Sequence, residues 1–110
     1  MREPIAAEGA EVLAALGDPT RRLVLDLLTE HGPASASILA ERVEISRQGL
    51  SKHLTTLVDA GVLTTAKVGR EVRYAISPTA LDAAAAWLDA RARQWDAQLA
   101  ALKQLAEGED

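Results

Sequence analysis

The stretch SRQGLSKHLTTLVDAG, residues 46–61, decides the fold because it contains a complete helix signal whose two faces differ in character. It opens on Ser46, a favoured N-cap residue, and closes on Gly61, a residue favoured just beyond a helix end. No acidic residue occurs between residues 46 and 56. A surface helix usually carries acids as well as bases, so the acid-free polar face predicts a negatively charged partner. The apolar side chains have the spacing of one buried stripe, and they are Leu50, Leu54, Leu57 and Val58.

The segments on either side of this helix complete a longer pattern. Ser35 is the expected N-cap of a short helix, and the residues EIS at 44–46 then form a tight turn. Downstream, LTTAKVGREVRYAI at 63–76 contains two strand-like runs around Gly69-Arg70. Glycine at the first position of a two-residue turn predicts a type II′ hairpin with a basic tip. Two short helices joined by such a turn and followed by this ribbon are typical of a winged helix-turn-helix.

Two helices are predicted before this pattern. One covers residues 5–16. The other begins at Pro19, with Asp18 as its N-cap, and Gly32-Pro33 ends it near His31. His31 lies at a helix end, where its partial positive charge suits the helix dipole, so we interpret it as structural.

A last long helix is predicted at 78–106, with Ser77 as its N-cap and Pro78 at its first position. Its apolar residues alternate in steps of four and three, which is a heptad seam. The expected fold class is therefore mainly α with a small β-hairpin, a winged helix-turn-helix in the order α-α-α-α-β-β-α. Residues 1–110 are expected to form one DNA-binding domain, with the recognition helix at 47–60 and the wing at 63–76.

The charges are distributed unevenly along the chain. The formal net charge is −4, which alone argues against a nucleic-acid partner. Residues 46–76, however, carry five basic and two acidic side chains, whereas the remainder carries seven basic and fourteen acidic ones. One basic segment in an acidic protein indicates a localised surface for a polyanion, and chance clustering is the alternative.

Several functions are excluded by what the sequence lacks. There is no cysteine, so disulfides, thiolate metal sites and cysteine nucleophiles are ruled out. Ser51 and His53 lie about 200° apart on a helix and cannot form a nucleophile–base pair, and no glycine-rich phosphate loop is present. Acids interrupt the only apolar run near the N-terminus, and no stretch approaches the ~18 apolar residues of a membrane span. We expect a soluble cytoplasmic protein with no membrane partner, no cofactor and no enzymatic activity.

An α-helix fits the major groove of DNA, where side chains that donate and accept hydrogen bonds read the base edges. Glutamine can pair with adenine, lysine can reach guanine, and arginine or histidine can contact bases or phosphates. Basic residues of the hairpin are expected on phosphates or in the minor groove. A solvated helix face that lacks acids by accident is the competing interpretation. The expected DNA contacts are Arg47, Gln48, Ser51, Lys52, His53, Thr55 and Thr56 on the helix, and Lys67, Arg70 and Arg73 on the hairpin.

Arg21 and Arg22 lie in the first turn of the second helix, where positive charge is unfavourable. An ion pair with Asp26 or Glu30 is the favoured explanation, and contact with the DNA backbone is the alternative.

The apolar stripe of the last helix is longer than one winged core can cover. Left exposed, it would be a large apolar patch, so we expect a symmetric dimer through helices 5–16 and 78–106. Folding back on the first helix within one chain is the alternative. Trp87 and Trp95 are expected to fill the dimer core, with a ligand pocket as the alternative. The expected interface residues are Val12, Leu13, Leu16, Leu81, Leu88, Trp95, Leu99 and Leu102.

Three segments, LGDPTRRLVLDLL, SRQGLSKHLTTLVDAGVL and VGREVRYAI, resemble the ArsR-type (arsenic repressor-like) winged-helix regulators. The resemblance covers about residues 10 to 105. It implies a homodimeric bacterial repressor, associated with the nucleoid, that binds a palindromic operator in double-stranded DNA through a dimer held by its first and last helices. A winged helix that serves only as a protein-interaction module is the alternative.

The sequence departs from the metal-sensing members of that family. The resemblance aligns their cysteine pair with Ser35 and Ser37, whose hydroxyls are poor ligands for thiophilic ions. A second family site uses histidine and carboxylates on the last helix, and that helix here contains Asp82, Asp89 and Asp96 but no histidine. We therefore predict a member of the non-metal-sensing branch, with no metal site and with its effector left open.

Overall fold

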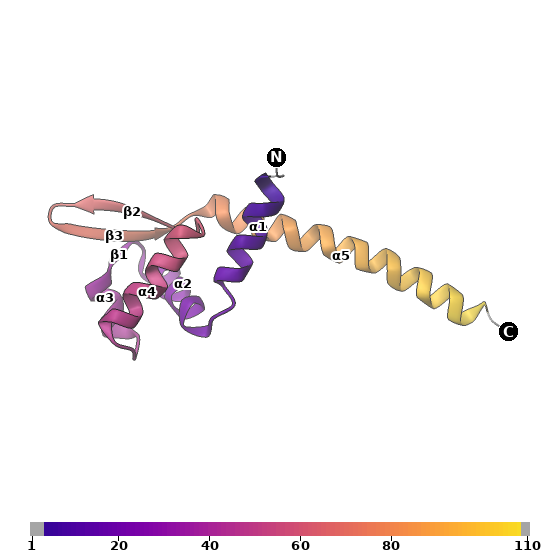
Figure 1. Cartoon of the computed structure of the whole chain (residues 1–110), viewed down its shortest axis with the longest axis horizontal. Coiled ribbons are helices and arrows are strands. Elements are labelled where there is room, and N and C mark those ends of the chain that lie inside the picture. The colour runs from indigo at the N-terminus through magenta and orange to yellow at the C-terminus, as the bar shows by residue number, and fades with distance from the viewer. Residues whose placement is uncertain (1–3, 109–110) are drawn as a thin grey trace.

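A computed structural model of the chain describes the backbone of residues 4–108 and the side chains from residue 9 onward. Ile5, the start of the predicted first helix, therefore has its side chain outside the described residues. Within residues 4–108, five helices and three short strands follow one another (Figure 1). They are α1 (Pro4–Ala15), α2 (Pro19–His31), β1 (Ala34–Ser35), α3 (Ala36–Arg42), α4 (Arg47–Asp59), β2 (Leu63–Val68), β3 (Glu71–Ile76) and α5 (Pro78–Glu107).

Side-chain caps fix where four of the helices begin. The Asp18 carboxylate accepts hydrogen bonds from the backbone N–H groups of Thr20 and Arg21, at 2.7 and 3.2 Å. The bond from Arg21 is the main reason why the pKa of Asp18 lies below its ordinary value. The helices α3, α4 and α5 begin in the same way, because the hydroxyls of Ser35, Ser46 and Ser77 accept hydrogen bonds from backbone N–H groups of the first turn. Each of these caps was predicted from the sequence.

The strands form one antiparallel sheet in the order β1-β3-β2. The predicted hairpin is confirmed, and the turn at Gly69-Arg70 joins Val68 to its partner Glu71. A type II′ turn requires a positive φ at its first central residue, and Gly69 has φ +65°. Among the described residues only glycines have a positive φ, so the second central residue, Arg70, does not. The prediction of two strands was incomplete, because a third strand, β1, is present. Its residues Ala34 and Ser35 pair with the edge of β3 that faces away from β2.

The core lies where α1, α2, α3 and α4 meet the base of the sheet. The predicted stripe of α4 is confirmed, since Leu50, Leu54 and Leu57 are at most 1% exposed. Val12, Val24, Leu39 and Leu63 complete the innermost layer. The buried side of α4 thus holds the helix in place and leaves the other side to solvent.

Helix α5 leaves this core and projects away from the sheet, so that the chain measures 70 × 34 × 22 Å (Figure 1). Only its first turns are covered, with Ala80 and Ala84 buried. Gly9 of α1 permits this contact, because a Cβ there would lie 2.8 Å from both the Ala83 carbonyl oxygen and the Trp87 Cβ. Trp87 is half-buried against α1, and the Arg91 guanidinium lies 4.2 Å from the centre of its ring.

Candidate nucleic-acid interface

The outer face of α4 presents polar and basic side chains to solvent. Ser46 starts the helix by accepting a hydrogen bond from the Gly49 N–H at 2.9 Å. The short helix α3 and a four-residue connection lead into it, so the arrangement is the predicted helix-turn-helix. Six of the seven predicted contacts on α4 are exposed, and these are Arg47, Gln48, Ser51, Lys52, Thr55 and Thr56.

Arg47 is held in place by the helix before it. Its guanidinium donates a hydrogen bond to the Ser37 hydroxyl at 3.1 Å. A cleft beside this contact separates the start of α4 from the wing, and Arg70 and Glu71 lie on its far wall. A cation therefore stands on each side of the cleft, one from the helix and one from the wing.

His53 differs from the other predicted contacts on α4. It is half-buried, and its Nδ1 lies 3.3 Å from Nη1 of Arg21 on α2. Arginine can only donate hydrogen bonds, so Nδ1 is the acceptor in this contact. One ring nitrogen of His53 thus faces α2, and contact of this residue with DNA stays a prediction.

The explanation offered for Arg21 and Arg22 was wrong. In the described part of the chain neither forms an ion pair with Asp26 or Glu30. Nε of Arg21 donates to the Ala15 carbonyl, and Nη1 of Arg22 donates to the Leu16 carbonyl at 2.7 Å. These carbonyls are at the C-terminal end of α1, where the helix dipole favours positive charge and the last oxygens need donors.

The strand register divides the basic residues of the wing between its two faces. Residues directly opposite each other in an antiparallel pair share a face. Lys67 is opposite Val72, on the face that continues from buried Leu63, whereas Arg73 is opposite Ala66 on the other face. The wing reaches past the helices at its turn end, as Figure 1 shows, so both faces are exposed there.

Arg73 also has a partner within the wing. Its Nε lies 3.3 Å from a carboxylate oxygen of Glu71 on the same face. Both side chains are about half exposed. This carboxylate competes with a phosphate for Arg73, which leaves Lys67 and Arg70 as the wing cations without an ion pair in the described residues.

The predicted dimer residues fall into three groups according to their exposure in a single chain. Val12 is 1% exposed within a single chain, so it belongs to the protomer core and cannot contribute to an interface as we expected. Leu13 and Leu16 are half-buried. The others form a line of exposed side chains on α5, and sequence reasoning missed Leu105 beside them. We call the exposed line Leu88, Trp95, Leu99, Leu102 and Leu105 the outer stripe of α5; each is between 51% and 66% exposed, and Leu81 at its start is 36% exposed.

The positions that carry cysteines in metal-sensing relatives have other roles here. Ser35 is buried and caps α3, while the hydroxyl of Ser37 accepts the bond from Arg47. Across the described residues, no three histidine, aspartate or glutamate side chains come together in a group that could hold a metal ion.

None of the helices that the structure describes is both long and apolar enough to cross a membrane.

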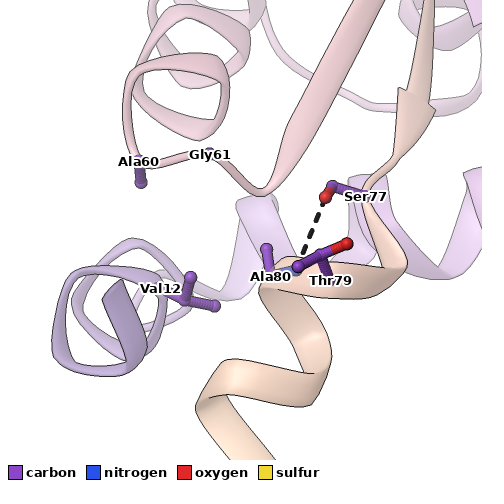
Figure 2. Close-up of a pocket in the computed structure, with 6 residues that line it drawn as sticks. All are labelled: Val12, Ala60, Gly61, Ser77, Thr79 and Ala80. Carbon is purple, nitrogen blue, oxygen red and sulfur yellow. Dashed lines mark hydrogen bonds between the residues drawn. The ribbon is translucent and has the colours of Figure 1, made fainter. Parts of the chain in front are cut away.

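A small cavity of about 180 Å³ lies where α1, the α4–β2 connection and the start of α5 meet. Figure 2 shows Val12 on one side of it, Ala60 and Gly61 above, and Ser77 with Ala80 on the other side. Its lining residues carry no charge, and the Ser77 hydroxyl is occupied by the cap bond from the Ala80 N–H at 3.4 Å. The Thr79 hydroxyl is the other polar side-chain group of the lining, so the cavity offers few groups that would orient a polar ligand.

An exposed helix that carries no acid up to Thr56 follows a tight turn and is accompanied by a basic wing. These features define the class: this is a winged helix-turn-helix of the kind that binds DNA. A protein-family model described as a helix-turn-helix domain matches residues 16–66 of this chain. The chain is 36% identical to the transcriptional repressor SdpR of Bacillus subtilis over 70% of this chain and 84% of that protein. It is 37% identical to the arsenical resistance operon repressor of Staphylococcus xylosus over 68% of this chain and 71% of the relative.

A solved structure of an ArsR-like transcriptional regulator from Rhodococcus sp. RHA1 has a TM-score of 0.75 and 44% identity, covering 91% of this chain and 93% of that one. The chain belongs to the ArsR family of winged helix-turn-helix transcriptional regulators. The predicted fold class and the predicted family are thereby confirmed. It is a DNA-binding regulator, and because its relatives are regulators, the prediction that it is not an enzyme is confirmed as well.

Proposed function

We propose that the chain is a homodimeric repressor that binds a palindromic operator through α4 and the wing. The observation that carries this proposal is the outer face of α4, which is exposed, rich in hydrogen-bonding groups and free of acids up to Thr56. A partner rich in negative charge and in hydrogen-bonding edges matches that face, and the major groove of DNA is such a partner. The names of two relatives, both repressors, support the repressor part of the proposal.

Gln48 and Lys52 are one helical turn apart on this face and are proposed to read bases. Glutamine can bond adenine through two hydrogen bonds, and lysine can donate to guanine. Ser51, Thr55 and Thr56 are proposed as adaptable neighbours. Arg47 and Arg70 face the cleft between α4 and the wing and are proposed to bind backbone phosphates.

The dimer is proposed because one recognition helix reads only a few base pairs. The outer stripe of α5 offers a surface that a second copy would cover, and Leu13 and Leu16 of α1 lie half-buried on the other terminal helix. A two-fold contact of these helices would present two α4 helices to successive turns of the same DNA face.

The regulator is further proposed to respond to something other than a thiophilic metal. Ser35 is buried as the cap of α3, so its oxygen already accepts the Ile38 N–H at 3.3 Å. Ser37 is engaged by Arg47. Replacing both serines by cysteine would then be needed before a soft ion could bind at that place.

A salt titration with DNA selected by the protein from a random-sequence library tests the proposal. Each phosphate neutralised contributes about −0.9 to the slope of log affinity against log salt. Gln48→Ala and Lys52→Ala should lower operator preference by ~1–3 kcal/mol for each lost base contact. The controls are Gln104→Ala and Lys103→Ala, which remove the same residue types from exposed positions of α5.

The controls should bind like the wild type. If the library selection enriches no DNA sequence and the affinity for DNA does not change with salt, the chain is a winged helix that binds proteins instead of DNA. A loss of preference in the α5 controls equal to that in the α4 variants would remove α4 as the reading helix.

A further inference from the structure

The guanidinium of Arg21 joins three helices at one point. The residue itself lies in the first turn of α2. Its Nε donates to the Ala15 carbonyl at the end of α1, and its Nη1 lies 3.3 Å from Nδ1 of His53 on α4. A single side chain thus links the end of a terminal helix to the helix that carries the polar face.

The neighbouring arginine provides a contrast. Arg22 is exposed, and the one acceptor of its side chain within the described residues is the Leu16 carbonyl, so it caps α1 and not α4. The two arginines cap different carbonyls at the end of α1, and Arg21 differs from Arg22 in having a second partner, His53. The additional contact of Arg21 with His53 therefore concerns the placement of α4.

The surroundings hold the Arg21 side chain in this position. Asp18 accepts the Arg21 backbone N–H at 3.2 Å, and this bond is the main cause of the lowered pKa of its carboxyl. Beside the guanidinium, a cleft between α1 and α4 is lined by Glu11 and Asp59, so acids stand on both helices that it joins. A guanidinium has a planar, rigid set of donors, and two of its nitrogens are directed to partners on different helices.

We propose that Arg21 is a positioning residue that fixes α4 relative to α1 and thereby sets the spacing of DNA half-sites that the dimer accepts. This inference rests on the proposed homodimer. Two copies held together by their terminal helices present their α4 helices at a separation that depends on how each α4 is fixed to α1. One added base pair moves a half-site by about 3.4 Å and turns it by about 35° around the DNA axis. A rigid α1–α4 connection rejects that change, whereas a loose one accepts it.

The test compares full-length wild type, Arg21→Gln and Arg22→Gln on the palindrome that the wild type selects, with its centre lengthened or shortened by one base pair. The wild type and Arg22→Gln should lose affinity by about tenfold for either altered spacing, as for a mismatch in the site. Arg21→Gln should bind the three spacings within about threefold of one another. Its dimerisation and its salt slope should equal those of the wild type.

A second pair of variants leaves the α1 cap intact and serves if Arg21→Gln fails to fold. His53→Asn keeps an acceptor near the place of Nδ1 and should retain the spacing discrimination, whereas His53→Ala removes the acceptor and should lose it. Asparagine and histidine have similar helix propensities, so this difference does not arise from the helix itself.

The outcomes separate the inference from the function on which it rests. If the wild type binds its palindrome and both Arg21→Gln and His53→Ala discriminate spacing as it does, Arg21 is not a positioning residue. A salt slope reduced by about 0.9 in Arg21→Gln would show instead that Arg21 contacts a phosphate, which also overturns the inference. If the wild type selects no spaced palindrome, the proposed function itself is wrong, and the inference with it.

Discussion

Replacing Leu99 on α5 tests whether the outer stripe is the surface through which two chains associate. Leu99 is 58% exposed in a single chain and lies near the middle of the stripe, with Trp95 and Leu102 on either side along the helix. In the proposed dimer it would be covered by the second copy. Leu99→Ala removes most of the apolar surface at this place without adding a charge, and Leu99→Asp also introduces a carboxylate.

The magnitude follows from the exposed fraction. Burying a whole leucine side chain contributes ~1.5–3 kcal/mol, so covering the exposed 58% of Leu99 contributes about 1–2 kcal/mol. A two-fold dimer contains the residue twice, which gives about 2–4 kcal/mol for Leu99→Ala. Because about 1.4 kcal/mol is a tenfold change, the dissociation constant of the dimer should rise by about 30-fold to about 700-fold. Leu99→Asp should raise it further, because an unpaired carboxylate would be buried.

Sedimentation equilibrium over a range of protein concentrations measures the dissociation constant directly. Ala97→Asp is the matched control, since residue 97 is exposed and lies about 160° around the helix from Leu99. The control introduces the same charge and should leave the dimer unchanged. Operator affinity should fall in Leu99→Asp but not in the control.

Two results would refute the reasoning. One is a wild type that sediments as a monomer at micromolar concentration and still binds its operator. The other is a dimer weakened equally by Leu99→Asp and by Ala97→Asp, which would show that charge on α5, and not the covered stripe, determines association.

Three further predictions concern the wing, a helix cap and the α1–α5 contact. Arg70→Ala should weaken binding to all DNA sequences about equally and reduce the salt slope by about 0.9, as measured by fluorescence anisotropy; a changed sequence preference with an intact slope would contradict this. The lowered pKa of Asp18 means that its carboxylate stabilises the native state above pH 3.8 and that this contribution is lost as the pH falls through the lowered pKa. Asp18→Asn should remove that part of the pH dependence in urea unfolding between about pH 2 and pH 6, and an unchanged profile would count against the cap. Gly9→Ala should destabilise the fold, because the new Cβ would lie 2.8 Å from the Ala83 carbonyl oxygen. The ~1–3 kcal/mol cost of overpacking exceeds the ~1 kcal/mol that alanine gains over glycine in a helix, so a thermal melt that shifts upward would be the opposite result.

The sequence predicted those parts of the fold that depend on neighbours along the chain. The starts of α2, α3, α4 and α5 were found because each has a capping side chain within four residues of the N–H that it binds. The type II′ turn was found because Gly69 must adopt a positive φ. Even the division of Lys67 and Arg73 between two faces follows from that turn, because a two-residue loop fixes the register of the whole hairpin.

The parts that depend on distant segments were not predicted. Strand β1 has two residues, too few for an alternating pattern, and Ser35 belongs to it while also capping α3. The partners of Arg21 and Arg22 are main-chain carbonyls of the preceding helix, and a search for acidic side chains could not find them. Val12 has the apolar character of an interface residue and of a core residue alike, and only the packing of α1 on its own chain separates the two.

The short strand β1 determines how the DNA-binding half of the chain moves. Ser35 pairs with Arg73 in β3 and caps α3, while Ser37 on α3 holds Arg47 at the start of α4. Wing, α3 and α4 are therefore connected by hydrogen bonds at each junction and form one preorganised body. The conformational entropy of ordering them is lost on folding, so association with DNA needs only surface side chains to become ordered. A signal that acted inside this body would have to break the sheet, whereas one that acted where α1 meets α5 would shift the body as a whole.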